Sequence, residues 1–356
     1  MASLQDIAAI NPKSDQLQNT FIYIDLEAVE KGELRKIQEI MREEAPSRAQ
    51  RVINNNDILF QCVRPYQKNN YIHKILNTSN QQWVASTGYA QIRTTESPNY
   101  IYHLLNTDGF NRKVMVRCTG SSYPAINSED LATIRFYYTP DKKEQFKISR
   151  LLDLIDERIA TQNKIIEDLK LLKSAIRKKV FVSLKEEHTE SCEINQLLTY
   201  EQPTAYIVTN DEYSTDTTLI PVLTANKGFV LGYTDEDFSI YQKGECIIFD
   251  DFTMDAKYVS FPFKVKSSAI KILTAKPNVN LRFMFEYLSY LELKSEEHKR
   301  HYISEIASLV VELPSKEMQN KIASLMTSLD NKLALEENTK VKYEDEKQYQ
   351  LSQMFI

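Results

Sequence analysis

The chain has 356 residues, of which 42% are hydrophobic and 26% are charged, and its formal net charge is −5. This length and composition predict a folded protein of two or three domains, each with enough apolar residues for its own core. The seven glycines form neither a G-x-G-x-x-G nor a Walker A motif. Dinucleotide, P-loop and S-adenosylmethionine binding by this chain are therefore not supported.

The net charge argues against polyanion binding over the whole surface, but it averages over regions of different charge. One region between residues 164 and 179 is locally basic, with Lys164, Lys170, Lys173, Arg177, Lys178 and Lys179. Local basic surface on a weakly acidic protein is compatible with DNA binding without proving it.

Cysteine usage and the N-terminal residues bear on the compartment. The four cysteines are widely spaced and include no C-x-x-C pair, which predicts reduced thiols in a cytosolic protein. The first residues contain no basic segment followed by an apolar one, and no apolar run reaches 18 residues. We expect neither a signal peptide nor a membrane span.

Residues 1–139 alternate short apolar runs with polar loops, as expected of a globular region of strands and short helices. Strands are predicted at 57–63 and 91–93, and a helix begins near Tyr100. Residues 120–124 (Gly-Ser-Ser-Tyr-Pro) are typical of a turn.

Residues 140–183 are predicted to form a long helix. Asp141 is its expected N-cap, and Glu144 would complete a capping box. Apolar residues then recur at spacings of three and four, which indicates a heptad seam for packing against another helix. The seam includes Ile148, Leu152, Ile155, Ile159, Ile166 and Leu169, with Gln162 as an interruption.

Residues 184–313 repeat the globular pattern with different loops. The segment 245–249 corresponds to the strand at 57–60, and 283–288 corresponds to the helix at Tyr100. Similar frameworks with different loops predict two related binding surfaces of different specificity.

Residues 314–356 are predicted to form a second long helix with Ser315 as its N-cap. Met326 is an alternative to Leu325 in its seam, and beyond Leu335 the apolar pattern becomes sparse. We expect this distal part to depend on the first helix or on another subunit for its order. The seam consists of Ile322, Leu325, Leu329 and Leu333.

The two helices are copies of one sequence, 174 residues apart, so the chain is interpreted as a tandem duplication. A pseudo-two-fold axis would make the helices antiparallel, and about 35 helical residues span roughly 50 Å. The matched positions are Pro140/Pro314, Lys142/Lys316, Gln145/Gln319, Lys147/Lys321, Ile148/Ile322, Leu151/Leu325, Asp156/Asp330, Ala160/Ala334, Lys173/Lys347 and Phe181/Phe355.

These residues resemble the specificity (S) subunits of type I restriction–modification enzymes along essentially the whole chain. Segment 151–170 is very similar to the central conserved helix of that family, and Pro140 with Glu144 and Gln145 fits the start of that helix. Segment 120–126 is similar to its G-S-x-x-P motif. Segments 200–206, 223–234, 247–253 and 263–269 resemble one recurrent type of target recognition domain. Met318 departs from the usual Glu-Gln start of the second helix.

The resemblance implies an α+β fold. Two target recognition domains of mixed strands and short helices, 1–139 and 184–313, are related by pseudo-two-fold symmetry. Two long antiparallel coiled-coil helices, 140–183 and 314–356, separate them. It implies a non-catalytic subunit that binds a bipartite double-stranded DNA target and docks two modification (methyltransferase) subunits and restriction (translocase/nuclease) subunits. This chain would bind no cofactor, since S-adenosylmethionine, ATP and Mg²⁺ belong to those partners, and it would be cytoplasmic in a bacterial or archaeal cell.

Candidate DNA contacts are loop residues, because Arg and Lys suit phosphates and guanine, whereas Ser, Thr and Tyr suit phosphates and base edges. No catalytic residues or metal ligands are predicted, and adjacent Asp250 and Asp251 are assigned a structural role. The candidates are Arg64, Lys68, Ser86, Thr87, Arg93, Ser121, Ser122, Tyr123, Tyr233, Thr234, Lys264, Lys266, Ser267 and Ser268.

Two alternatives stay open from the sequence. One is the recognition subunit of a related restriction–modification enzyme that cuts on both sides of its site, which has the same chain architecture. The other is a coiled-coil scaffold protein without DNA binding, for which DNA affinity would be absent or insensitive to salt.

Overall fold

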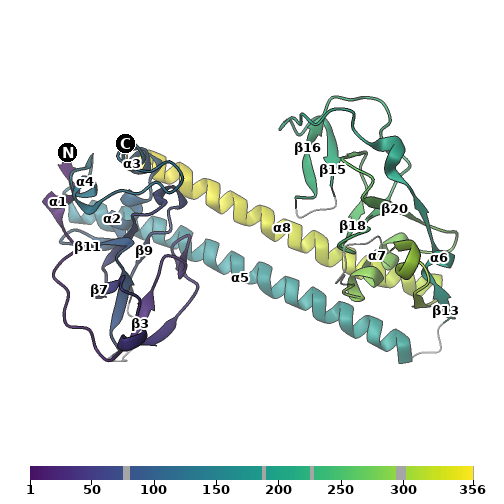
Figure 1. Cartoon of the computed structure of the whole chain (residues 1–356), viewed down its shortest axis with the longest axis horizontal. Helices are drawn as coiled ribbons and strands as arrows, with labels where there is room; N and C mark the ends of the chain where they lie inside the picture. Colours follow the sequence, from purple (N-terminus) through teal and green to yellow (C-terminus); the bar gives the residue numbers. More distant parts are fainter. Residues whose placement is uncertain (75–80, 187–189, 225–227, 294–301, 356) are drawn as a thin grey trace. The chain divides into compact units, whose positions relative to one another are not determined.

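The computed structural model describes residues 1–74, 81–186, 190–224, 228–293 and 302–355. The chain divides into two compact units (Figure 1), and each is described by itself. Unit 1 consists of residues 1–163 and 338–356, and unit 2 of residues 164–337. Both long helices therefore contribute one part to each unit, so the compact units differ from the four consecutive segments expected from the sequence.

Unit 1 contains two four-stranded sheets, the first part of one long helix and the last part of the other. Its elements are β1 (Ala2–Ser3), α1 (Leu4–Ile7), β2 (Ala8–Ile10), β3 (Thr20–Ile24), β4 (Val29–Glu30), β5 (Glu33–Leu34), β6 (Gln38–Met41), η1 (Arg42–Glu44), β7 (Ala49–Ile53), β8 (Ile58–Gln61), η2 (Pro65–Gln67), β9 (Tyr71–Ile72), β10 (Trp83–Ser86), β11 (Tyr89–Thr94), α2 (Pro98–Leu105), α3 (Asp108–Met115), α4 (Ser128–Ala132), β12 (Arg135–Phe136) and the start of α5 (Lys142–Glu186).

The strands of unit 1 form one sheet in the order β2-β11-β8-β9 and another in the order β6-β3-β10-β7. All four residues of β8 are buried, as expected of a continuous apolar run in a central strand. One face of this strand packs against α2, where Phe60, Tyr100 and Leu104 belong to one core cluster. The strand and the helix predicted from the sequence thus form the core of unit 1.

Unit 2 repeats this arrangement. Its elements are β13 (Glu190–Glu193), α6 (Ile194–Leu197), β14 (Leu198–Glu201), η3 (Pro203–Tyr206), β15 (Ile220–Leu223), β16 (Val230–Thr234), β17 (Cys246–Asp250), β18 (Ala256–Val259), β19 (Lys264–Val265), β20 (Ile270–Ala275), α7 (Leu281–Tyr290), the π-helical segment η4 (Tyr302–Ile306), β21 (Val310–Leu313) and the first part of α8 (Lys316–Met354).

The main sheet of unit 2 has the order β14-β20-β17-β18, which matches β2-β11-β8-β9 strand for strand. Strand β17 and helix α7 occupy the places of β8 and α2, so both correspondences predicted from the sequence are found. The second sheet differs, because it has three strands in the order β16-β15-β19. The two units therefore share a framework and diverge in the strands and loops built on it.

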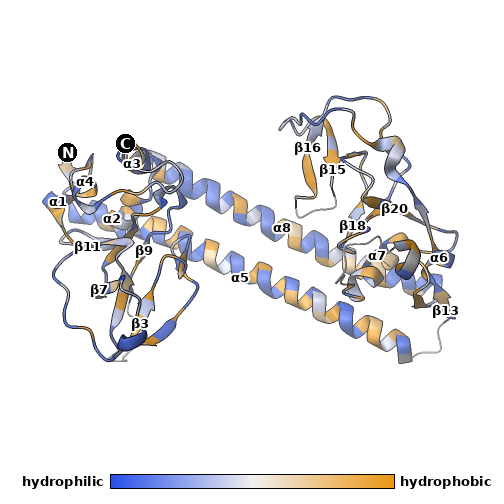
Figure 2. Ribbon diagram, in the orientation of Figure 1, coloured by the Kyte–Doolittle hydropathy of each residue, from blue (hydrophilic) through white to orange (hydrophobic). Residues whose placement is uncertain are grey.

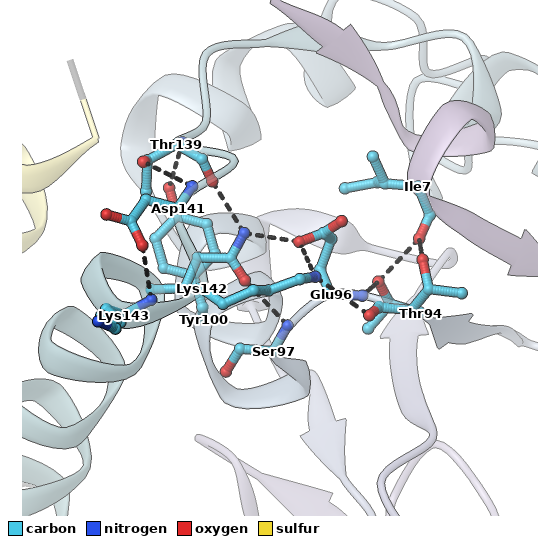
Figure 3. Close-up of polar contacts among 11 residues, drawn as sticks. Ile7, Thr94, Glu96, Ser97, Tyr100, Thr139, Asp141, Lys142 and Lys143 are labelled. Atoms are coloured by element: carbon cyan, nitrogen blue, oxygen red, sulfur yellow. Dashed lines mark hydrogen bonds and ion pairs between the residues drawn. The ribbon is translucent and has the colours of Figure 1, made fainter.

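A buried glutamine fixes the start of each long helix. Gln145 Oε1 accepts a hydrogen bond from Ser97 N at 3.0 Å, and its Nε2 donates to Thr139 O and to Glu96 (Figure 3). Because Ser97 directly precedes α2, this side chain joins the start of α2 to the start of α5. The Gln145 side chain is fully buried, and both its oxygen and its nitrogen are hydrogen-bonded. A side chain with one acceptor and one donor group is needed at this position, which explains the glutamine.

The second helix repeats this contact. Gln319 Oε1 accepts from Asn280 N at 2.9 Å, and its Nε2 donates to Pro314 O at 2.9 Å, which joins α8 to α7. The matched pair Gln145/Gln319 is thus conserved between the repeats for a shared structural task.

The predicted capping of α5 is only partly correct. Asp141 Oδ1 accepts from Lys143 N at 2.8 Å, as an N-cap does. Glu144 instead accepts from the Thr139 hydroxyl at 2.6 Å. Asp141 N donates to that hydroxyl at 3.2 Å (Figure 3). The threonine takes the place of the expected reciprocal contact, because its hydroxyl can donate and accept. Ser315 caps α8 as predicted, accepting from Met318 N.

Hydrophobic and hydrophilic residues alternate along α5 and α8 (Figure 2). Most predicted seam residues are covered, with Leu152, Ile155, Ile166 and Ile322 buried and Ile148, Ile159, Leu169, Leu329 and Leu333 half-buried. Leu325 is a correction: it is 43% exposed, whereas its neighbour Met326 is fully buried in the unit 2 core. Gln162 does not interrupt the seam but is itself buried.

Helix α8 continues to Met354, beyond the point where its apolar pattern becomes sparse. Leu351 is buried, and the Phe355 ring lies 5.1 Å from that of Tyr100 on α2. In unit 2 the matched residue Phe181, near the end of α5, lies 5.6 Å from Phe283 on α7. Each globular core is therefore completed by the end of the long helix that belongs to the other repeat.

Ion pairs join the two long helices within each unit. In unit 1, Lys347 Nζ lies 2.5 Å from Asp156 Oδ1, and in unit 2, Lys173 Nζ lies 2.5 Å from Asp330 Oδ1. The two pairs are equivalent, because Lys173 and Asp156 correspond to Lys347 and Asp330 at the 174-residue offset. In unit 2, Lys170 pairs with Glu337, so the residue number on α8 rises as that on α5 falls, and the two segments are antiparallel there.

Candidate nucleic-acid interface

Several loops of unit 1 converge near the turn between β10 and β11. In the register of β10 and β7, Ala85 lies opposite Arg51. Thr87 N donates to Arg48 O at 2.8 Å, and Cys62 N donates to Gly88 O at 3.0 Å. The arginine cluster is the name used below for Arg48, Arg51 and Arg64, which these pairings bring to one end of the sheets.

Arg64 has an unusual backbone conformation, with φ 54° and ψ 53° in the left-handed region. Its amide donates to Pro124 O at 2.7 Å, which ties it to the turn at 120–124. The guanidinium carbon lies 5.4 Å from the centroid of the exposed Tyr123 ring, within cation–π distance. Gly120 has φ 88°, and a Cβ there would lie 3.0 Å from Tyr123 O, so this turn favours glycine.

Arg51 and Arg64 lack the carboxylate partners that other basic residues have. Within the described ranges, neither forms an ion pair, and the Nε of each is buried without a hydrogen-bond acceptor. Burial lowers the pKa of Arg51 from its usual value. A buried donor without an acceptor is unfavourable, so a ligand that supplies an acceptor gains from meeting it.

Two other predicted contacts in unit 1 are already paired. Lys68 Nζ lies 2.5 Å from Asp108, and Arg93 donates two hydrogen bonds of 2.8 and 2.7 Å to the buried carboxylate of Asp57. This bidentate pair raises the pKa of Arg93. Arg93 also lies toward the other end of β11 from the converging loops, so the structure does not bring it to the arginine cluster.

The remaining candidates of unit 1 lie near the arginine cluster with different exposure. Ser86 is buried and accepts a hydrogen bond from Gly88 N, which makes it part of the turn. Thr87 is half-buried, whereas Ser121, Ser122 and Tyr123 are exposed. Sequence reasoning missed Arg48 and Arg51, although two arginines just before the apolar pair Val52-Ile53 were a visible signal.

In unit 2 the structure corrects the placement of Lys264. This lysine is fully buried, and its Nζ lies 2.6 Å from Glu236 and donates to Phe238 O at 2.9 Å. Burial by itself would raise the pKa of Glu236, but hydrogen bonds from Lys264 and Thr209 hold it at about 2. Lys264 therefore stabilises the loop rather than presenting its charge at the surface. Thr234 is likewise buried and accepts from Glu236 N.

Lys266, Ser267 and Ser268 lie between β19 and β20, as loop residues. Lys266 and Ser267 are exposed and Ser268 is half-buried, while Lys266 N donates to Leu223 O at 3.0 Å. This contact joins their loop to the end of β15. Residues 225–227, which belong to one of the segments matched from the sequence, lie outside the described residues.

An apolar groove on the smaller sheet of unit 2 was not predicted. Tyr233, a predicted contact, lies on its wall, and Phe261 is 41% exposed at its side. Its lining is Thr217, Leu219, Ile220, Pro221, Val230, Tyr233, Phe261 and Pro262. The loop surfaces of the two units thus differ in chemistry, one rich in arginine and the other largely apolar.

Asp250 and Asp251 have structural partners, in keeping with the role assigned from the sequence. Asp250 Oδ1 accepts from the amides of Phe252 and Thr253, and Asp251 lies 3.3 Å from buried Lys271 and accepts from Tyr302 N. In the part of the chain that the structure describes, no group of three or more His, Cys, Asp or Glu is arranged to hold a metal ion. No described helix is both long and apolar enough to cross a membrane.

The fold defines a class: a protein built from two copies of one mixed α and β framework, each carrying its own loops. Comparison with known proteins matches part of the chain to one family. Residues 186–344 match the model of the type I restriction modification DNA specificity domain. This is the family that the sequence resemblance indicated.

A curated relative is the type I restriction enzyme EcoR124I/EcoR124II specificity subunit of Escherichia coli. It is 39% identical over 142 residues, which cover 38% of this chain and 35% of the relative. The match thus spans about a third of that relative's length.

Two solved structures share the fold. The type I restriction-modification system S subunit from M. genitalium aligns over 100% of this chain and 95% of its own, with a TM-score of 0.66 and 14% identity. A chain from a type I R-M system, solved to explain complex assembly and conformational transition, aligns over 99% and 96%, with a TM-score of 0.61 and 18% identity. At these identities the likeness concerns the fold alone, and it extends over the whole chain.

Proposed function

We propose that this chain is the DNA sequence-specificity subunit of a type I restriction–modification complex and binds a bipartite double-stranded target. Unit 1 contacts one part of the target and unit 2 the other. The main support is the pair of matching sheets, β2-β11-β8-β9 and β14-β20-β17-β18, with loops of different chemistry. A duplicated framework with two different surfaces suits an asymmetric target in two parts.

The two repeats are proposed to be related by a pseudo-two-fold axis, with α5 and α8 as an antiparallel coiled coil between the recognition domains. The reciprocal pairs Asp156–Lys347 and Lys173–Asp330 support this relation. Helices of 45 and 39 residues are roughly 60 to 70 Å long at 1.5 Å per residue. Such helices can set a fixed spacing between two half-sites.

The helices are also proposed to dock two modification subunits and, through the assembled complex, restriction subunits. Helix α5 carries exposed apolar residues outside its seam, including Leu154, Ile165, Leu171 and Leu172. Exposed apolar surface on a helix favours protein contacts. The partners would bring S-adenosylmethionine, ATP and Mg²⁺, and this chain would act without catalysis in the cytoplasm.

Methylome sequencing of cells that express the complex tests the proposal. The expected result is adenine methylation that depends on this chain, at a motif of two short specific parts separated by a spacer of fixed length. A contiguous motif, or methylation that does not depend on this chain, would contradict it.

A second measurement separates this function from a scaffold that binds no DNA. The assembled complex should bind DNA with an affinity that falls steeply as salt rises, because basic side chains displace counterions from phosphates. Affinity that is absent or independent of salt would favour the scaffold.

A further inference from the structure

Arg64 is held in place before any ligand arrives. A residue with a side chain rarely adopts its left-handed backbone, and such strain persists only where surrounding contacts enforce it. The contacts are its amide bond to Pro124 O and the packing of its guanidinium against Tyr123. Strained, enforced positions of this kind are concentrated at functional sites.

The positive charge of Arg64 is not neutralised by an ion pair among the described residues. Among the described residues no carboxylate pairs with it, in contrast to Arg93, whose fork is occupied by Asp57. The Tyr123 ring packs against the guanidinium group at 5.4 Å, and a planar group that is already positioned loses little freedom when it makes two hydrogen bonds. Arg48 and Arg51 lie in the same cluster and can bind backbone phosphates, so Arg64 is not required for that contact.

We propose that Arg64 is a specificity-determining residue that donates two hydrogen bonds to a guanine in the half-site of unit 1, with Tyr123 as its positioning residue. Arg48 and Arg51 bind backbone phosphates beside it. The inference rests on the proposed function and deepens it. Guanine is the base that matches the geometry, because its O6 and N7 acceptors face the major groove side by side and accept both donors of one arginine.

Phosphate binding by Arg64 is the competing assignment, and the two differ in their response to substitution. Arg64→Lys keeps the charge but loses the planar fork, so a base contact is lost whereas a phosphate contact largely survives. Removing a phosphate contact weakens binding to every sequence and lowers the slope of affinity against salt by about one.

The experiment uses the complex assembled with its modification subunits, with the wild-type chain and the Arg64→Lys variant. Methylome sequencing should show one guanine position of one half-site becoming degenerate in Arg64→Lys, while the other half-site is unchanged. In binding assays the discrimination at that position should fall on the order of 10- to 100-fold, with an unchanged salt slope.

A base analogue locates the contact. Replacing that guanine with 7-deazaguanine removes the N7 acceptor, so it should weaken binding by the wild-type complex and have little further effect on Arg64→Lys. Tyr123→Phe, which keeps the ring, should retain the specificity, whereas Tyr123→Ala should relax it. Tyr123 is 67% exposed, so both variants are expected to fold.

Control variants complete the test. Arg51→Gln should weaken binding to all sequences and lower the salt slope without changing the motif. Lys266→Gln in unit 2 should leave the half-site of unit 1 unchanged. The inference is overturned if Arg64→Lys keeps the full motif, or if it only lowers the salt slope. A wild-type complex with no bipartite motif would instead contradict the proposed function.

Discussion

At the scale of single residues, His73 predicts how the stability of unit 1 depends on pH. Its ring is buried, and burial lowers its pKa to about 4 despite the nearby Asp57 carboxylate. Below pH 6.5 the unfolded chain binds a proton that the folded chain excludes, so stability falls as the pH falls toward 4. Between pH 7 and pH 5 the expected loss is at most about 2 kcal/mol.

Trp83 provides the measurement, because it is the single tryptophan of the chain and its ring lies 4.9 Å from that of His73. Urea unfolding followed by Trp83 fluorescence should give a midpoint that falls from pH 7 to pH 5. His73→Phe, which cannot be protonated, should remove most of this dependence. An equal pH dependence in both proteins would show that other groups cause it.

The basic side chains show what a sequence leaves undecided at this scale. Lys264, Arg93 and Arg64 all looked suitable for DNA from residue type and loop position. The structure buries the first beside Glu236, pairs the second with Asp57 and leaves the third without a carboxylate among the described residues. Glu236 is 28 positions from Lys264, and Asp57 is 36 positions from Arg93. Tyr123, which packs against Arg64, is 59 positions from it. The difference between the three side chains therefore depends on tertiary contacts.

At the scale of elements, the seam of α8 can be tested with two adjacent residues. Met326 is fully buried in the core of unit 2, whereas Leu325 is 43% exposed. Met326→Ala leaves a cavity and is expected to cost about 2 to 5 kcal/mol. Leu325→Ala removes an exposed side chain and should change stability by about 0.5 kcal/mol or less.

Amide hydrogen exchange of the buried strand β17 measures this difference within unit 2. Exchange should accelerate strongly in Met326→Ala and little in Leu325→Ala, which serves as the matched control. The reverse order would restore the seam position predicted from the sequence. The heptad pattern allows either of these adjacent apolar residues at the buried seam position. Packing against the core of unit 2 selects Met326.

At the scale of the whole molecule, the two repeats complete one another. In unit 1, Phe355 of the second repeat packs against the core and Lys347 pairs with Asp156. In unit 2, the matched Phe181 and Lys173 of the first repeat make the corresponding contacts. A fragment of residues 1–186 contains Phe181 and Lys173. It also contains Tyr100 and Asp156, which contact the matched residues Phe355 and Lys347 in the full chain. Two copies can therefore supply each other, as in a self-complementary two-fold interface.

We expect this fragment to form a homodimer, which size-exclusion chromatography with light scattering detects as twice the fragment mass. Phe181→Ala should weaken the dimer, because it removes the ring that replaces Phe355 against Tyr100. Lys178→Ala alters an exposed residue on the same helix and is the control. A soluble fragment that stays monomeric at all concentrations would contradict the proposed two-fold relation.

The sequence by itself determined the duplication, the two long helices, the central strands and the glutamine at each helix start. These features follow from local periodicity and from the fixed offset between the repeats, and both are visible in one chain. The family resemblance followed from the same segments, and comparison confirmed it.

Tertiary structure alone decided which charged side chains are paired, which of Leu325 and Met326 is buried, and where the arginine cluster and the apolar groove lie. It also decided that each core is completed by the other repeat's helix. Burial and ion pairing depend on residues far apart in the chain, such as Phe355 against Tyr100, and no local pattern specifies them.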